Sequence, residues 1–366
     1  MIAPKEHFHG SDLEKIENVY GIKKEDITSF SANVNPLGIS PRLRATLSER
    51  IDAITGYPDR EYTSLRRSIG AYLGADMENI LVGNGSTELI SLFIQFLSPK
   101  HSLILAPTYS EYEREIGLTG GEYSYFYLDE SHDFKLDTDK LINQLNSQLG
   151  LLVLCNPNNP TSSAIKKGEM RRILDVCKKN QIFCLVDETY AEFAPDTEDI
   201  TAVPLIKEYN NLIILRGISK FFAAPGLRLG YALCSNLEVL KIINERKNPW
   251  TINTLAAIAG EIMFTDTEYI KATKTLIDLE RNRIWNILLN NKNIKVYPVF
   301  ANFILIKILK PDITSSQVFE AALRKGLMIR DCSTFPGLDE SFIRFCFMTP
   351  EKNDELLQVL LALLKE

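Results

Sequence analysis

The sequence predicts an α/β protein in which a large domain, built on a mostly parallel sheet between helices, is joined to a smaller α+β domain. Short aliphatic runs in the middle of the chain are typical of strands buried on both faces. Stretches with helical periodicity separate them, as crossover helices do in a parallel sheet. The strand-like runs are 80–82, 102–106, 151–155, 182–186, 212–216 and 229–234, and the helical stretches include 86–97, 110–119 and 167–179. We expect the large domain to span residues 41–246.

The pattern changes after Pro249. A long helical stretch covers residues 254–289, and strands and helices then follow without regular alternation. The later strand-like runs are 294–296, 303–306, 328–329 and 343–347, and the later helical ones are 316–325 and 351–364. We expect residues 1–40 to join this part, so that the small domain consists of residues 1–40 and 247–366.

Composition favours a cytoplasmic protein without nucleic-acid or membrane partners. The 366 residues are 45% hydrophobic and 24% charged, with a net charge of −6, which argues against binding to nucleic acid. The six cysteines are scattered and form no C-x-x-C pair, so we expect a reducing compartment, no disulfide frame and no metal site. The polar start of the chain is unlike a signal peptide, and no apolar run is long enough to span a bilayer.

A loop with two glycines follows the run 80–82 and opens a helix. Its sequence is Gly83-Asn84-Gly85-Ser86-Thr87-Glu88. Glycines allow a ligand to approach the backbone closely, and the free N–H groups at a helix start favour a phosphate. The same residues also fit a plain tight turn capped by Ser86. No G-x-x-x-x-G-K-[ST] motif occurs, which excludes a P-loop.

An asparagine- and proline-rich segment follows the run 151–155. It reads Asn156-Pro157-Asn158-Asn159-Pro160-Thr161. Proline fixes φ and removes a backbone donor, so this segment is a rigid loop that presents amide side chains at the edge of the sheet. Asn-Pro pairs are also common in turns, but three asparagines interleaved with two prolines favour a binding role.

A carboxylate follows the run 182–186, in Asp187-Glu188-Thr189-Tyr190. A charge at the tip of a buried strand needs a partner, because burial without one is costly. The pyridinium N–H of a bound cofactor would be such a partner, and the carboxylate would then keep the ring nitrogen protonated. The alternative is that Asp187 caps the next helical segment.

A lysine follows the run 212–216, in Ser219-Lys220, and Arg228 lies eight residues further on. A lysine held near cations or apolar walls has a lowered pKa and can serve as nucleophile and base. The alternative is a surface lysine whose stem packs against the protein.

The order of these motifs resembles that of the fold-type I enzymes of the class I/II aminotransferase superfamily, which use pyridoxal 5′-phosphate (PLP). The resemblance covers essentially the whole chain, and it implies the type I fold of PLP-dependent transferases with a seven-stranded type of sheet in the large domain. All four motifs follow strand-like runs, and ligands of open α/β sheets bind at the carboxyl ends of strands. Two positions depart from the usual pattern, namely Ser162 in place of a glycine and Gly217 in place of a serine or threonine.

The resemblance implies a role for each motif. Lys220 would hold the cofactor as a Schiff base and move protons, and Asp187 would pair with the ring nitrogen. The other implied cofactor contacts are Asn159 and Tyr190 on the ring oxygen, Tyr109 on the ring face, and Gly85, Ser86, Thr87, Ser219 and Arg228 at the phosphate. Tyr57 would reach that phosphate from a second subunit, so the resemblance also implies a homodimer.

Two branches of the superfamily fit, L-threonine-O-3-phosphate decarboxylase of cobalamin biosynthesis and histidinol-phosphate aminotransferase of histidine biosynthesis. The aminotransferases usually carry a glutamate where this chain has Val34 in Asn33-Val34-Asn35-Pro36. The pair His9-Gly10 and the segments 249–253, 329–332 and 335–338 also look more like the decarboxylase. We therefore expect decarboxylation of L-threonine O-3-phosphate to (R)-1-amino-2-propanol O-2-phosphate, with 2-oxoglutarate-dependent transamination as the alternative.

Both branches bind an amine that carries a phosphate, so we expect a phosphorylated amino acid or amino alcohol as the substrate. The resemblance implies that Arg344 and Asn159 contact the substrate and that Arg344 binds its α-carboxylate as a bidentate pair. Arg330 is the candidate for the phosphate, assisted by His9 and Asn33. The alternative for Arg330 is a surface ion pair, which would contribute little.

Overall fold

A seven-stranded sheet forms the centre of the molecule. The computed structural model describes residues 8, 10 and 12–365. The strand order is β2-β8-β7-β6-β5-β3-β4, and β8 runs antiparallel to both neighbours while the other strands are parallel to one another. The strands are β2 (Ile80–Gly83), β3 (His101–Ala106), β4 (Glu122–Tyr127), β5 (Leu151–Cys155), β6 (Phe183–Asp187), β7 (Leu212–Gly217) and β8 (Gly230–Leu233). This confirms the predicted mostly parallel sheet.

Both faces of the large sheet are covered. Along β5, Leu151 and Val153 belong to one hydrophobic cluster, whereas Leu152 and Leu154 belong to the other, as the two-residue period of a strand requires. On the first face lie α4 (Gly85–Leu97), α5 (Glu111–Leu118) and α9 (Leu237–Arg246), and on the second lies α7 (Lys167–Lys179), flanked by α6 (Thr138–Ile142) and α8 (Thr197–Ile200). The aliphatic runs in the sequence reflect this double burial.

One strand of this sheet was not predicted. Strand β4 lies at the edge and reads Glu-Tyr-Ser-Tyr-Phe-Tyr, with most of its side chains exposed. An edge strand that faces solvent has no need of an aliphatic run, so the pattern that identifies its neighbours is missing from it.

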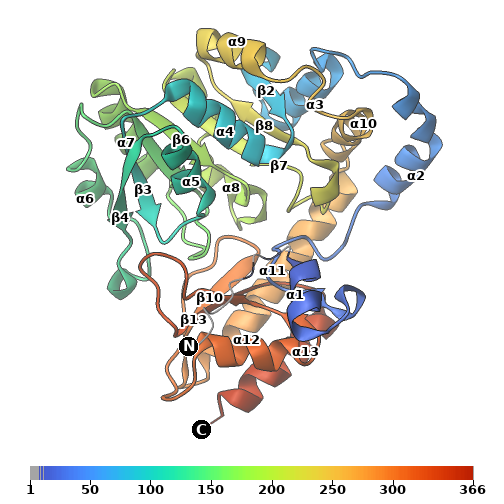
Figure 1. Cartoon of the computed structure of the whole chain (residues 1–366), viewed down its shortest axis with the longest axis vertical. Coiled ribbons are helices and arrows are strands. Elements are labelled where there is room, and N and C mark those ends of the chain that lie inside the picture. The colour runs from blue at the N-terminus through green and yellow to red at the C-terminus, as the bar shows by residue number, and fades with distance from the viewer. Residues whose placement is uncertain (1–7, 9, 11, 366) are drawn as a thin grey trace.

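A second, smaller sheet lies below the first in Figure 1, together with α12 (Ser315–Leu323) and α13 (Pro350–Leu363). Its order is β12-β13-β10-β9, with all three pairings antiparallel. The strands are β9 (Ile294–Val296), β10 (Phe303–Ile308), β12 (Arg330–Asp331) and β13 (Phe342–Cys346). A separate parallel pair joins β1 (Thr28–Ser29) to β11 (Leu327–Met328), and α1 (Leu13–Tyr20) contacts α12 through the rings of Tyr20 and Phe319. The predicted boundaries at residues 40/41 and 246/247 stay predictions.

Two expectations for this part were wrong in detail. The helical stretch 254–289 is divided into α10 (Thr254–Met263) and α11 (Thr267–Leu289), because the side chain of Asp266 accepts the N–H of Tyr269 and starts a new helix. The run 328–329 is not one strand, since β11 ends at Met328 and β12 begins at Arg330. Helices α2 (Pro41–Glu49) and α3 (Thr63–Leu73) pack against α10.

Helix α11 is the longest of the described helices, at 23 residues, and it carries charged side chains along most of its length. Among the helices in the described part of the chain, none is both long enough and apolar enough to cross a membrane.

Two cationic side chains occupy the outer edge of β2. The carbonyl of Ile80 accepts from Arg66 Nε at 3.0 Å, and the carbonyl of Val82 accepts from Lys247 Nζ at 2.9 Å. These two carbonyls point away from β8, so side chains take the place that another strand would fill.

The strand β8 passes very close to the first turn of α4. A methyl group on Gly230 would lie 2.4 Å from the carbonyl carbon of Gly85 and 2.4 Å from the backbone nitrogen of Ser86. Only a residue without a side chain allows this approach, which sets the position of the helix start against the sheet.

We expect Gly230→Ala to destabilise the protein by about 1–3 kcal/mol, because the added methyl would force the backbone of β8 and α4 apart. Urea denaturation of the purified chain measures the free energy of unfolding. Gly226→Ala is the matched control, since a methyl group there would meet no atom within 4 Å. Equal stability of the two variants would contradict this account of the close approach.

Candidate active site

A cavity of about 520 Å³ lies where the carboxyl ends of the large sheet face the smaller sheet. It brings together most of the residues that the sequence singles out. Those that line it are Asn33, Ser86, Thr87, Tyr109, Asn159, Asp187, Tyr190, Ser219, Lys220, Arg228, Arg330 and Arg344. These residues come from segments far apart in the sequence.

The start of α4 and Arg228 form one end of the cavity. Gly85 has a positive φ of 78°, and a side chain on it would collide with the guanidinium of Arg228, 2.4 Å from the nearest nitrogen. The helix N-cap is Asn84, with no side-chain capping bond, so the expected alternative of a turn capped by Ser86 is wrong. The free N–H groups, the Ser86 hydroxyl and the guanidinium together suit a phosphate.

Lys220 is half-buried and faces the cavity. Its Nζ donates to the carbonyl of Ala32 at 2.6 Å. Burial, together with the nearby positive charges of Arg344 and Arg228, lowers the pKa of Lys220 to about 8. This is not a surface lysine with its amine in bulk water. A substantial fraction of it is neutral, and therefore nucleophilic, near pH 8.

Asp187 is buried at the tip of β6 and accepts three hydrogen bonds. The Tyr112 hydroxyl donates to Oδ2 at 2.7 Å, and the backbone N–H and hydroxyl of Thr189 donate to Oδ1 at 2.9 Å and 2.5 Å. Burial raises the pKa of Asp187, and these bonds oppose the rise. The next helical turn, Ala191–Phe193, has Tyr190 at its N-cap position, so the expectation of Asp187 as a cap is wrong.

Asn33, Tyr109 and Tyr190 line the same cavity as Asp187. Asn33 Nδ2 donates to the hydroxyl of Tyr190 at 3.2 Å, and burial raises the pKa of Tyr190. Burial also raises the pKa of Tyr109 to about 12, against a hydrogen bond from Thr87 that lowers it. Tyr109 and Tyr112 meet edge to face, with ring centroids 5.6 Å apart, so the wall that they form is fixed by packing.

Arg330 and Arg344 lie opposite each other across the β12–β13 pair. Arg344 donates to Asn159 Oδ1 and, at 2.7 Å, to the carbonyl of Ser31. Arg330 donates to the carbonyl of Phe8 and, at 3.2 Å, to the Thr334 hydroxyl. Within the described residues, the Nε of each arginine has no acceptor. Arg330 is half-buried in the cavity lining, a position that favours a ligand contact over a surface ion pair.

Three predicted residues lie outside the cavity lining or outside the described chain. Gly85 contributes through its backbone, behind Arg228. Tyr57 is 82% exposed and packs on Trp250, with ring centroids 4.9 Å apart, so its contact with a cofactor in a second subunit stays a prediction. His9 lies outside the described residues.

Two contacts of the site were missed from the sequence. Tyr112 lies in the predicted helical stretch 110–119, but Tyr109 precedes it, so helical periodicity did not indicate that the two rings meet. The acceptor for Lys220 is a backbone carbonyl, that of Ala32, which no side-chain pattern announces.

Comparison with known proteins identifies the class. Residues 25–360 match the family model of aminotransferase class I and II, and the chain belongs to this family. A protein of Caldanaerobacter subterraneus subsp. tengcongensis, provisionally named a threonine-phosphate decarboxylase, is 38% identical over 92% of this chain and 90% of its own length. The threonine-phosphate decarboxylase of Salmonella typhimurium is 32% identical over 96% of this chain and 95% of its own. The crystal structure of the histidinol-phosphate aminotransferase from Clostridium acetobutylicum superimposes with a TM-score of 0.85, at 33% identity over 91% of this chain and 98% of that one.

Enzymes of this family work with PLP, and PLP is the cofactor of this chain. The residues present fit it. Asp187 is a buried carboxylate that pairs with no basic side chain in the described structure, and the N–H of a protonated pyridine ring supplies the missing partner. Gly85, Ser86 and Arg228 suit its phosphate, and the Lys220 amine suits its aldehyde.

We expect the rate at which the cofactor-free chain captures PLP covalently to rise with pH around a midpoint of about 8, because only the neutral Lys220 amine attacks the aldehyde. Visible absorbance in a stopped-flow instrument follows the capture. Arg344→Gln should move the midpoint upward, since it removes a charge that lowers the pKa of Lys220. Lys220→Ala should abolish the absorbance change that accompanies covalent capture. A wild-type midpoint near 10.5, the ordinary value for lysine, would contradict this assignment.

Proposed function

We propose that this protein decarboxylates L-threonine O-3-phosphate to (R)-1-amino-2-propanol O-2-phosphate, as a step of cobalamin biosynthesis. The observation that carries the proposal is the pair Arg330 and Arg344, which face each other across β12 and β13 and both line the cavity that holds Lys220. Two guanidinium groups with unused Nε donors suit a short substrate that bears two anionic groups. A phosphorylated amino acid is such a substrate. The similarity to threonine-phosphate decarboxylases supports the choice.

The residues divide the work by position. Bound PLP supplies an electron sink that weakens one bond at the substrate Cα. Arg344, with Asn159 beside it, binds the α-carboxylate, and Arg330, with Asn33, binds the phosphate. By holding these two groups together, Arg344 and Arg330 would fix the orientation of the substrate Cα, and hence whether CO₂ or a proton leaves. Lys220 Nζ then delivers the proton that replaces CO₂ at Cα.

Transamination of histidinol phosphate is the second candidate, because the Clostridium acetobutylicum structure of that activity covers nearly the same chain at similar identity. The same cavity residues would serve it. Lys220 would then remove the hydrogen from Cα, and 2-oxoglutarate would be the second substrate.

We expect the purified holoenzyme to release CO₂ from O-phospho-L-threonine and to form no glutamate from 2-oxoglutarate with histidinol phosphate. Parallel assays of CO₂ and of glutamate, on the same preparation, measure both. Absence of CO₂ together with formation of glutamate would replace the proposal by its rival.

The substitution Arg330→Gln tests the assignment of the phosphate. It should raise KM for the phosphorylated substrate about 10–100-fold, the effect of losing hydrogen bonds to a charged group. Arg324→Gln is the control, because the Arg324 side chain is 80% exposed and lies outside the cavity lining. An equal change in both variants would remove Arg330 from the substrate site.

A homodimer is a further part of the proposal. Four large apolar side chains, Ile51, Ile54, Tyr57 and Trp250, are exposed, and Tyr57 packs on Trp250. A second copy that covers this surface would bury them and bring Tyr57 toward the phosphate of its partner's cofactor.

We expect a dimer in sedimentation velocity and a cofactor dissociation constant that Tyr57→Phe raises about tenfold, since the variant loses one hydrogen bond to a phosphate. Tyr123→Phe, at an exposed tyrosine of β4, is the control. A monomer, or a Tyr57→Phe variant with wild-type affinity, would rule out the contact.

A further inference from the structure

A buried cluster of three charged side chains lies behind the strand ends that carry the cofactor site. Arg216 Nε and Nη2 donate to Glu188 Oε2 at 3.0 Å and 2.7 Å, and Arg216 Nη1 donates to Glu192 Oε1 at 3.2 Å. All three side chains are at most 4% exposed. None of them lines the cavity, so none can touch the cofactor or the substrate.

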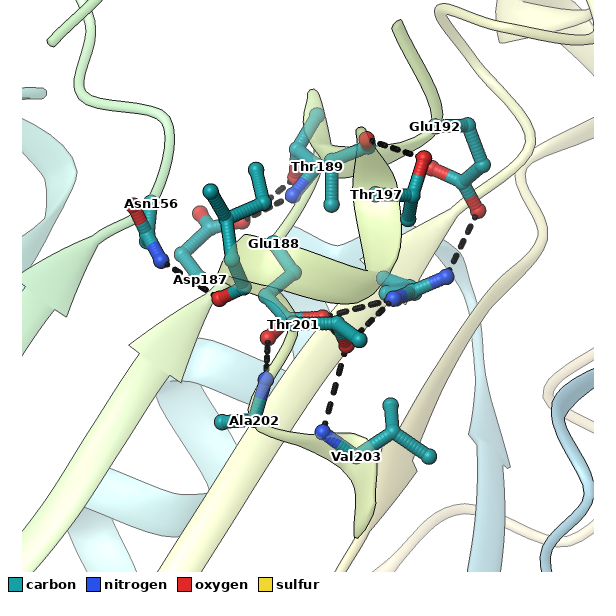
Figure 2. A network of polar contacts seen from close by, with 12 residues as sticks. Asn156, Asp187, Glu188, Thr189, Glu192, Thr197, Thr201, Ala202 and Val203 are labelled. Atoms are coloured by element: carbon teal, nitrogen blue, oxygen red, sulfur yellow. Dashed lines mark hydrogen bonds and ion pairs between the residues drawn. The ribbon is translucent and has the colours of Figure 1, made fainter. Parts of the chain in front are cut away.

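Most polar atoms of the cluster form hydrogen bonds (Figure 2), although Glu192 Oε2 has no partner among the described residues. Glu188 also accepts from the Thr201 hydroxyl at 2.9 Å and from the backbone N–H of Ala202 at 2.6 Å, and Arg216 donates to Thr201 at 2.9 Å. Buried charges of this kind contribute little stability over an apolar core, but they impose one geometry on the groups they join. The segments that this cluster joins are therefore held in a fixed relative position.

Arg216 joins two segments that both supply cofactor contacts. Its first carboxylate partner, Glu188, directly follows Asp187, and the second, Glu192, lies four residues further on, so that Thr189 and Tyr190 stand between them in the chain. Arg216 itself is the last residue before Gly217 in β7, four residues ahead of Lys220. A backbone bond from Glu188 to the carbonyl of Leu215, at 2.8 Å, adds a second link between the same segments.

We propose that Arg216 is a positioning residue, which acts through Glu188 and Glu192 to hold Asp187 and Tyr190 in place relative to Lys220. The guanidinium of Arg216 donates to the carboxylates on both sides of the Thr189–Tyr190 pair. The side chain of Tyr190 therefore cannot shift independently of Arg216. A lysine at this position keeps the charge but has no fork that reaches both carboxylates. The inference rests on the PLP site and is independent of the substrate.

The test is a pH titration of the visible absorption band of bound PLP, recorded without substrate. In Arg216→Lys and Glu188→Gln, we expect the midpoint to rise by about 1 pH unit or more. When Asp187 and Tyr190 move away from the ring, the ring nitrogen loses its proton and the ring oxygen loses a donor. The nitrogen that joins Lys220 to the cofactor then keeps its own proton to higher pH.

The control is Arg283→Lys, which breaks a similar two-bond pair with Glu280 in α11, at 2.9 Å and 2.6 Å, away from the cavity lining. Loss of melting temperature in all three variants with unchanged midpoints would overturn the proposal, because it would leave the cluster a purely structural role. A raised midpoint confined to the Arg216 and Glu188 variants would support it. If Arg216→Lys does not fold, the outcome for Glu188→Gln, which keeps the shape of the side chain, decides.

Discussion

Parallel strands of one sheet all end at the same edge, and the cavity of this protein depends on that constraint. Strands β2, β3, β5, β6 and β7 run in the same direction, and each is followed by a segment that lines or supports the cavity. Ser86 and Thr87 follow β2, Tyr109 follows β3, and Asn159 follows β5. Asp187 and Lys220 follow β6 and β7, which are neighbours. The antiparallel strand β8 contributes differently, by lying so close to α4 that only glycine fits.

The same edge is buried, and burial explains which side chains are paired. Polar groups removed from water need partners, and most of those in the site have them within the protein. Lys220 donates to Ala32, Asp187 accepts from Tyr112 and Thr189, and Arg344 donates to Asn159. The groups that keep unused capacity, such as the Nε atoms of the two arginines, mark the places where a ligand completes the set. The fold thus prepares the cavity before any ligand enters it.

Motifs in the sequence were enough to predict the family, the central sheet without its edge strand β4, and twelve of the residues that line the cavity, because most of these motifs follow a strand and are continuous along the chain. What they did not reveal depends on partners from other segments or on solvent. Strand β4 lacks an aliphatic run because its side chains face water. At the break in the stretch 254–289, the side chain of Asp266 caps the new helix, and periodicity alone does not show such a cap. The ion pairs of Arg216 with Glu188 and Glu192 were not predicted either, because nothing in the sequence near these strand ends links the three residues.

The cations on the outer edge of β2 have a consequence for how this protein behaves when crowded or newly made. An open sheet edge is a template for another chain, and edge-to-edge pairing is a route to aggregates. At this edge Arg66 and Lys247 already hold the carbonyls of Ile80 and Val82. A foreign strand would have to displace two charged side chains, one of them buried, before it could pair. These two hydrogen bonds therefore oppose the addition of a further strand at the β2 edge of the sheet.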